Sequence, residues 1–308
     1  INPELEDGHS AIEFYLTEKY CDVGKKIHTG RSRNDQILVT LRLYARHSLG
    51  ELVKSVEKIL QTFKKKVRQF GAITMPGYTH MQRAMPSSVG MWLGSYAESL
   101  EDDLGLIGAV QKIIDQNPLG SAAGFGETVL GIDREFTTRE MGFAKVQKNP
   151  MYCALSRGKF ENMILQALSH VVFDLAKMAN DLLLFTTKEF GFFDLPEEFK
   201  TGSSIMPQKK NFDVLELIRG NISVFYAQQF QIQEVIKNLP SGYNRDFQLT
   251  KEPFMKGLKV AQNMFEIFDL VVHHLIVNKG QLSSACSKEL YATEAVYKRV
   301  KKGEAFRD

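Results

Sequence analysis

Apolar residues recur at spacings of three and four along most of the chain, with polar residues between them. One such run connects Leu49 to Val67, and a second connects Val89 to Ile107. Further runs cover residues 160–185, about 214–236 and 254–277. This spacing places apolar side chains on one face of an α-helix, and the sequence has no sustained two-residue alternation of the kind that predicts strands. The pattern therefore predicts an all-α protein with five long helices.

The length of these helices predicts how they assemble. A helix of about 25 residues is about 40 Å long, because the α-helix rises about 1.5 Å per residue. Five such helices favour an elongated central bundle over a compact globule. The runs at 160–185 and 254–277 are apolar around more than one face. This favours burial on several sides, including burial against other subunits.

Composition and charge exclude several classes of protein. Of 308 residues, 44% are hydrophobic and 24% are charged, and the net charge of +3 is too small to indicate a nucleic-acid partner. The three cysteines lie far apart and lack the spacing of metal ligands. They favour a reducing, cytoplasmic compartment and no bound metal. No run of 18 apolar residues is free of charge, so no membrane span is expected.

Candidate chemistry is concentrated in the stretch GSSIMPQKKN, residues 202–211, between two helical runs. The stretch does not match the phosphate-binding pattern G-x-x-x-x-G-K-[ST], and Ser203 has no base at a fixed short spacing. Its hydroxyls, lysines and asparagine suit a carboxylate and the negative charge that builds when the neighbouring carbon loses a proton. A solvated surface loop is an equally good interpretation of this stretch alone.

Two other turns are also rich in hydrogen-bond donors. KKIHTGRSRNDQ, residues 25–36, gathers histidine, arginine and asparagine around Gly30, as an anion-binding corner does. PGYTHMQRAMPSS, residues 76–88, places Thr79 and His80 in a turn before the second long helix. A lone histidine in such a turn is more often structural than catalytic. Three donor-rich turns, each beside a long helix, are nevertheless hard to explain by packing and favour a ligand site.

At these three stretches the chain resembles the argininosuccinate lyase branch of the fumarase/aspartase superfamily. Residues 202–211 meet the superfamily signature G-S-S-x-M-P-x-K-x-N, and the other two turns are typical of the branch. The likeness extends from about Glu6 to Leu249. It implies β-elimination of argininosuccinate to arginine and fumarate, a fumarase/aspartase-like bundle and no cofactor. It also implies a homotetramer whose sites are shared between subunits.

The resemblance carries the family's catalytic residues over to matching positions. Ser203 matches the base that takes the succinyl Cβ proton, and Lys209 matches a residue that stabilises the negative intermediate. His80 matches the histidine linked to general-acid chemistry at the leaving guanidinium, and Glu216 matches the glutamate that pairs with it. The stretch from Asp213 to Glu216 also has the spacing of a capping box at a helix start, so Glu216 has a structural alternative.

The resemblance also implies substrate-binding residues. Asn211 is expected to help Lys209 hold the intermediate. The residues expected to bind substrate carboxylates are Ser32, Arg33, Asn34 and Thr79. Those expected to hold the arginine part or a carboxylate are Tyr243, Gln248 and Lys251.

The family pattern further implies three domains and exposes three departures, the first of which is Asp7-Gly8-His9 where the family has Asp-Val/Ile-His. Residues 1–29 match the remainder of an N-terminal helical domain, residues 30–281 the central bundle, and residues 282–308 the start of a C-terminal domain. Phe212 stands where the family usually has proline. The family's S-D/E-R-D-F reads as residues 156–160, SRGKF, with the arginine one place early. Arg157 therefore receives no predicted role.

Two alternatives stay open at this point. One is a sister lyase that acts on another succinyl-amine such as adenylosuccinate, although Gln208 and the turn at residues 25–36 argue against it. The other is a catalytically silent structural relative, as the lens delta-crystallins are. This alternative is disfavoured because the chain retains the family residues Ser203, His80, Lys209 and Asn211. The departures from the family pattern at Arg157 and Phe212 keep the alternative open.

Overall fold

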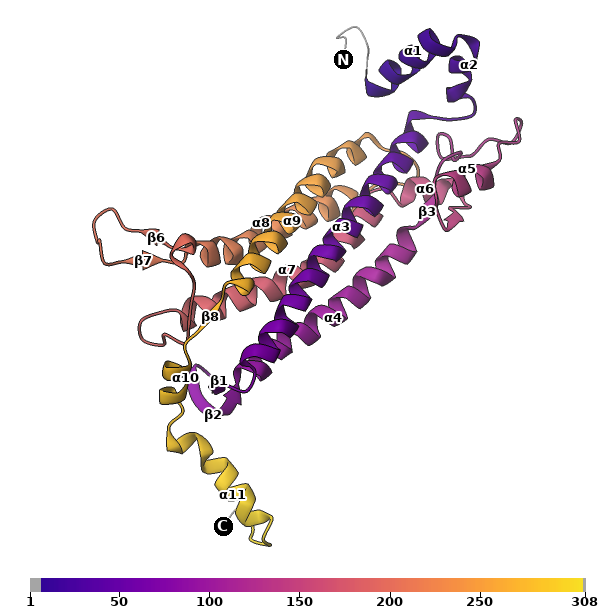
Figure 1. Ribbon diagram of the computed structural model, residues 1–308. Helices are drawn as coiled ribbons and strands as arrows, with labels where there is room; N and C mark the ends of the chain where they lie inside the picture. The colour runs from indigo at the N-terminus through magenta and orange to yellow at the C-terminus, as the bar shows by residue number, and fades with distance from the viewer. Residues whose placement is uncertain (1–6, 307–308) are drawn as a thin grey trace. The chain divides into compact units, whose positions relative to one another are not determined.

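The computed structural model describes residues 7–306 and confirms the predicted all-α bundle fold (Figure 1). Each apolar run of the sequence forms one long helix. These helices are α3 (Arg33–Phe70), α4 (Val89–Ile114), α7 (Lys159–Phe185), α8 (Asp213–Ile236) and α9 (Lys251–His273). Within residues 7–306, none of the helices combines the length and the apolar character that crossing a membrane requires.

Shorter elements connect the long helices. The short α-helices are α1 (Gly8–Tyr20), α2 (Asp22–Lys25), α5 (Arg134–Glu140), α6 (Pro150–Leu155), α10 (Lys279–Ala285) and α11 (Ala292–Val300). The 3-10 helices are η1 (Lys26–His28), η2 (Glu197–Phe199), η3 (Arg245–Thr250) and η4 (Lys288–Tyr291). The paired strands are β1 (Thr74–Thr79) with β2 (Gln82–Ser88), β3 (Gln116–Asn117) with β4 (Lys145–Val146), β5 (Phe193–Asp194) with β8 (Ile276–Val277), and β6 (Thr201–Gly202) with β7 (Lys210–Asn211). Only the β3–β4 pair is parallel.

The described chain forms two compact units, and each combines three separate segments. Unit 1 contains residues 7–51, Ile107–Gln166 and Ala227–Leu258. Unit 2 contains Leu52–Leu106, Ala167–Tyr226 and residues 259–306. The domain boundaries that the family pattern places after residues 29 and 281 stay a prediction.

The core of each unit is made by the apolar faces of the long helices. In unit 1, Leu49, Phe160 and Phe254 are buried, and Tyr44 packs edge-on against Phe254 with the ring centroids 6.3 Å apart. In unit 2, Phe63 and Phe268 are buried and make a similar edge-on contact at 6.2 Å. Burial of such aromatic side chains contributes most of the free energy that holds helices together. The three- and four-residue spacing of the sequence thus corresponds to real buried faces.

The stretch PGYTHMQRAMPSS differs from the simple turn that the sequence predicts. It forms a β-hairpin, in which β1 pairs with β2 from Thr74–Ser88 to Thr79–Gln82. His80 and Met81 form its two-residue turn, with φ angles of 51° and 61°. Positive φ at both positions suits the twist of a two-stranded hairpin. The sequence lacks the Asn-Gly pair that usually announces such a turn, so pattern alone did not indicate strands here.

Candidate active site

The signature stretch is the tip of a two-stranded ribbon in unit 2. Thr201 pairs with Asn211 and Gly202 with Lys210, so that residues 203–209 form the connecting loop. The hydroxyl of Thr201 donates to both carboxylate oxygens of Asp213, at 2.5 and 2.6 Å, and ties the ribbon to the first residue of α8. Figure 1 shows the ribbon and its loop standing out from this end of α8. The loop is therefore fixed at its base while its tip is open to a ligand.

The hydroxyl oxygen of Ser203 lies over backbone amides of its own loop. It accepts hydrogen bonds from the N–H of Met206 at 3.1 Å and from the N–H of Ile205 at 3.4 Å. Hydrogen bonds donated to an oxygen favour its deprotonated form over its protonated form. Within residues 7–306, no histidine, lysine or carboxylate side chain is hydrogen-bonded to Ser203. The loop itself therefore stabilises a negative charge on the Ser203 oxygen.

The two lysines of the signature have different surroundings. Lys210 forms an ion pair with Glu197 at 3.1 Å, and Glu197 also pairs with Lys200 at 3.0 Å. Hydrogen bonds from these two lysines lower the pKa of the Glu197 carboxyl. Lys209 is exposed, and its side chain contacts no acidic group among the described residues. Lys209 is thus the signature cation that is available to an anionic ligand.

His80 and Glu216 are both exposed side chains in unit 2. Thr79 ends β1, and His80 follows it in the hairpin turn. Glu216 lies in the first turn of α8. The Asp213 carboxylate is occupied by Thr201, and the structure contains no reciprocal capping-box contact between Asp213 and Glu216 within the described residues. No contact joins Glu216 to His80 in the described chain either, so the pairing of these two residues stays a prediction.

In unit 1, the buried carboxylate of Asp35 organises the turn at the start of α3. One oxygen accepts from the N–H of Ser32, and the other accepts from the N–H groups of Gly120 and Ala122, all at 2.9 Å. Burial raises the pKa of Asp35, and these backbone donors oppose that rise. The bonds hold Ala122 at a φ of 51°, a left-handed conformation that is unusual for a residue with a Cβ atom. Asp35 thereby joins two turns that are far apart in the sequence.

The predicted residues next to Asp35 are held in different ways. The Ser32 hydroxyl accepts from the N–H of Asn34 at 3.2 Å, which fixes the first turn of α3. Arg33 donates to the Ser10 hydroxyl at 2.9 Å and pairs with Asp7 at 3.4 Å. The guanidinium of Arg33 is therefore engaged with the start of α1 in this chain.

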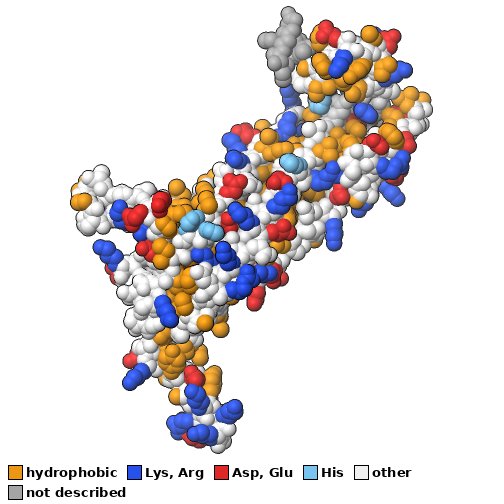
Figure 2. Space-filling view, in the orientation of Figure 1, with side chains coloured by type: hydrophobic (Ala, Val, Ile, Leu, Met, Phe, Trp, Pro, Cys, Tyr) orange, Lys and Arg blue, Asp and Glu red, His pale blue; other side chains and the backbone are white. Residues whose placement is uncertain are grey.

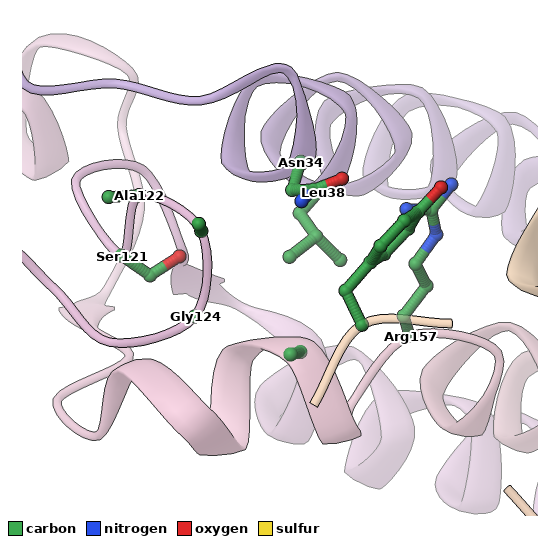
Figure 3. Close-up of a pocket in the computed structure, with 9 residues that line it drawn as sticks. Asn34, Leu38, Ser121, Ala122, Gly124 and Arg157 are labelled. Carbon is green, nitrogen blue, oxygen red and sulfur yellow. The ribbon is translucent and has the colours of Figure 1, made fainter. Parts of the chain in front are cut away.

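Tyr243, Gln248 and Lys251 lie around η3 and the start of α9. The amide of Gln248 donates to the Tyr243 hydroxyl at 3.1 Å, and Lys251 is the first residue of α9. Tyr243 also lines a small pocket in unit 1 (Figure 3). The pocket lining is Asn34, Leu38, Ser121, Ala122, Ala123, Gly124, Ala154, Arg157 and Tyr243.

This pocket brings together two predicted residues and two features that the sequence analysis missed. Asn34 and Tyr243 were expected to bind substrate, whereas Arg157 and the turn at Ser121 were not. Residues 117–120, Asn-Pro-Leu-Gly, have the composition of a turn. The local sequence does not connect this turn to α3. The two are joined by long-range hydrogen bonds, which the N–H groups of Gly120 and Ala122 donate to the Asp35 carboxylate.

The predicted site residues divide between the two units. Unit 1 contains Ser32, Arg33, Asn34, Tyr243, Gln248 and Lys251. Unit 2 contains Thr79, His80, Ser203, Lys209, Asn211 and Glu216. Each unit therefore contains one donor-rich group of predicted residues, and the four that the family resemblance marks as catalytic lie in unit 2. Within residues 7–306, no group of three or more His, Cys, Asp or Glu side chains is placed to hold a metal ion.

Comparisons with solved structures identify the fold. An EDDS lyase in complex with formate matches with a TM-score of 0.85 at 24% identity, over 96% of this chain and 59% of that one. A class II fumarase from Schistosoma mansoni matches with a TM-score of 0.73 at 20% identity, over 83% of this chain and 58% of that one. At these identities the likeness concerns the fold alone, and the chain spans about three fifths of the length of these proteins.

Comparisons of sequence are more specific. The protein family described as Lyase matches residues 5–225. The argininosuccinate lyase of Thermotoga neapolitana is 42% identical over 308 residues, which are all of this chain and 77% of that protein. The argininosuccinate lyase of Xylella fastidiosa is 44% identical over the same length, which is 69% of that protein. With this identity over its whole length, and with the signature loop of residues 202–211 intact, the chain belongs to the argininosuccinate lyase family.

Proposed function

We propose that this protein cleaves argininosuccinate to arginine and fumarate by β-elimination. The observation that carries the proposal is the signature loop, in which the Ser203 oxygen receives two backbone N–H groups and Lys209 has no acidic partner among the described residues. The sequence relatives are named for the same activity. Both the local chemistry and the family therefore favour removal of a proton beside a carboxylate.

Ser203 is assigned the first proton transfer. It takes a proton from the succinyl Cβ, and the electron pair that is left behind delocalises into the adjacent carboxylate. This intermediate carries an additional negative charge, which a positioned cation and hydrogen-bond donors stabilise more than they stabilise the substrate. Lys209 and Asn211 supply that cation and a donor amide. The backbone donors of Met206 and Ile205 stabilise the deprotonated Ser203 oxygen, which is the form that accepts the Cβ proton.

His80 is assigned the second proton transfer. The C–N bond breaks as the electron pair forms the double bond of fumarate, and the leaving guanidino nitrogen receives a proton from His80. A carboxylate partner keeps a histidine protonated near neutral pH, and Glu216 is assigned that role. Both side chains are exposed within this chain, so they are free to meet in an assembly.

The remaining family positions are assigned to substrate binding. Ser32, Arg33, Asn34 and Thr79 bind carboxylates. The other three hold the arginine part or a carboxylate: Tyr243, Gln248 and Lys251. Arg33 would exchange its contact with Asp7, a partly exposed ion pair at 3.4 Å, for a substrate carboxylate. Such an exposed pair contributes only about 0 to 1 kcal/mol, so the exchange costs little.

The proposal includes a cytoplasmic homotetramer with sites shared between chains. Exposed apolar side chains on the helices of unit 2 support the assembly, since Leu217 is 65% exposed and Leu270 is 49% exposed. Beside them lies a mainly apolar groove, lined by Val214, Leu217, Ile218, Asn221, Val260, Asn263, Met264 and Ile267. Figure 2 shows further hydrophobic side chains exposed among charged ones on the visible face. Apolar helix faces of this kind are typically covered in symmetric oligomers.

One assay tests the activity. Fumarate formation is followed by ultraviolet absorbance with argininosuccinate as the substrate, and then with adenylosuccinate. Turnover of argininosuccinate alone is expected. Turnover of adenylosuccinate instead would indicate a sister lyase, and no turnover of either by a folded oligomer would indicate a silent structural relative.

A further inference from the structure

Arg157 is buried in unit 1, with all of its hydrogen-bonding capacity unused. The side chain is 2% exposed, and none of the three guanidinium nitrogens has a hydrogen-bond partner. A guanidinium offers five N–H donors and stays charged in proteins. Buried polar groups almost always have partners, and an unpartnered buried charge is costly. The burial of these unused donors therefore needs an explanation.

The neighbours of Arg157 do not neutralise it fully. Its guanidinium carbon lies 5.4 Å from the ring centroid of Tyr243 and 5.8 Å from that of Phe247. Glu161 is also buried, and its charge favours the charged form of Arg157, as the nearby Tyr243 hydroxyl also does. Burial acts in the opposite direction and lowers the pKa of Arg157. One oxygen of Glu161 has no hydrogen-bond partner, so the pair has not formed a bidentate contact.

A second buried arginine shares Glu161 and provides a comparison. Arg42 donates to the carbonyl of Ile114 at 2.9 Å and to the Ser156 hydroxyl at 3.4 Å, and it lies over the Phe160 ring at 4.1 Å. The charge of Glu161 stabilises Arg42 as well as Arg157. Both buried guanidinium groups thus interact with the Glu161 carboxylate, and Arg42 also interacts with Asp115. Apart from the neighbouring Tyr243 hydroxyl, the donors of Arg157 are unused and available to an anion.

A small pocket lies beside Arg157. Figure 3 shows Arg157 near Asn34 and Leu38, opposite the turn that carries Ser121, Ala122 and Gly124. Ser121 lies within this turn and is one of the residues that line the pocket. The cavity has a volume of about 10 Å³, at the lower limit for a single water molecule, so a carboxylate enters only when the lining side chains move apart. A planar carboxylate matches the fork of a guanidinium bidentately.

The residue after Arg157 has little room for a side chain. Gly158 has a φ of 75°, and a Cβ atom there would lie 2.5 Å from Cγ2 of Ile236. A side chain is therefore excluded at residue 158, where the family pattern S-D/E-R-D-F has its arginine. In this chain the guanidinium comes from residue 157 instead and enters the pocket from there.

We propose that Arg157 forms a carboxylate subsite at the floor of this pocket and binds one carboxylate of the substrate, with Asn34 and Ser121 as additional donors. This assignment rests on the proposed lyase function for the identity of the ligand. It makes Arg157 a specificity residue, because a substrate that lacks the carboxylate leaves the buried charge unpaired. The carboxylate comes either from the arginine part or from the succinyl part.

Direct binding distinguishes these two sources. Calorimetric titrations of the full chain use L-arginine, agmatine, which is arginine without its carboxylate, and fumarate. In Arg157→Gln we expect binding of either arginine or fumarate to weaken at least about tenfold, the cost of one lost charge-assisted contact. In Arg157→Lys we expect a smaller loss, because lysine keeps the charge but not the fork. Agmatine binding should be unchanged.

The affected probe identifies the source of the carboxylate, and three results would overturn the subsite. They are unchanged binding of both carboxylate probes in Arg157→Gln, an equal loss for agmatine, and the absence of carboxylate binding by the parent protein. The protein could also bind carboxylates through Arg157 and yet fail to cleave argininosuccinate. That result would contradict the proposed function but would still support the carboxylate subsite.

Thermal unfolding without ligand separates a binding role from a structural one. Arg157→Met removes a buried charge that lacks hydrogen bonds, so this variant should melt no lower than the parent protein. Arg42→Met is the matched control. It removes an arginine that is buried in the same unit and hydrogen-bonded to Ile114 and Ser156, so it should melt several degrees lower. A drop for Arg157→Met as large as that for Arg42→Met would show a structural arginine and overturn the proposal.

Discussion

Asp103 in α4 should make the stability of unit 2 depend on pH. Asp103 and Asp174 each have a buried carboxylate oxygen without a hydrogen-bond partner. Burial raises the pKa of Asp103 to about 6, and the charge of Asp174 adds to the rise, whereas His170 opposes it. The folded protein thus favours the protonated form of Asp103 relative to the unfolded chain. The associated stability is fully present below about pH 4 and is lost as the pH rises through about 6.

The size of the effect follows from the shift. A change from 3.8 to about 6 corresponds to roughly 3 kcal/mol at about 1.4 kcal/mol per pKa unit. Because solvent screens part of this interaction, we expect about 1 to 2 kcal/mol. Asp103→Asn mimics the protonated carboxyl. It should raise the free energy of unfolding by that amount at pH 8 and leave it nearly unchanged at pH 4.

Urea unfolding of Asp103→Asn at pH 4, 6 and 8, at one protein concentration, measures this difference. Asp102→Asn is the matched control on the same helix, because Asp102 is exposed and should change the free energy by less than about 0.5 kcal/mol at every pH. A stability change for Asp103→Asn that is the same at pH 4 and pH 8 would refute the reasoning.

Four further substitutions test the roles assigned to residues of the two units. Ser203→Ala should lower kcat at least about a hundredfold in the fumarate assay while the protein melts within a few degrees of the parent; substantial residual turnover would remove Ser203 as the base. Lys209→Met should lower kcat about a hundredfold, and Lys210→Met less than about fivefold, because Lys210 is already paired with Glu197; equal losses would favour a loop that attracts anions diffusely. Asp35→Ala leaves three backbone N–H groups without their acceptor and should lower the free energy of unfolding by about 3 kcal/mol in denaturant titrations. A loss below about 1 kcal/mol would show that Asp35 does not hold the two turns together.

The long helices could be predicted from the sequence because their cores depend on a local period. Leu49 and Phe63 belong to one repeating apolar face, and both are buried. The hairpin at His80 could not be predicted in the same way. Its turn residues adopt positive φ without the asparagine and glycine that normally do so.

The candidate site was predictable only where the family motif fixes the residues. Ser203 and Lys209 were found from the signature, but the motif does not say that Lys210 is neutralised by Glu197. Arg157 received no role from the sequence because its pocket is assembled by long-range contacts and because the arginine lies one position before that of the family pattern. The close approach of Gly158 to Ile236 likewise cannot be read from the sequence.

The central claim is a lyase site built from donor-rich turns of different chains, with His80 and Ser203 from separate subunits. Two inactive proteins, His80→Ala and Ser203→Ala, are unfolded together and refolded as an equal mixture. If the chains mix freely, each site has about a one-half chance of an intact histidine and about a one-half chance of an intact serine, so about a quarter of the sites should work. Fumarate formation from argininosuccinate at about a quarter of the rate of the refolded parent is the predicted result. No recovered activity, in a mixture shown to contain hybrid tetramers, would contradict the claim.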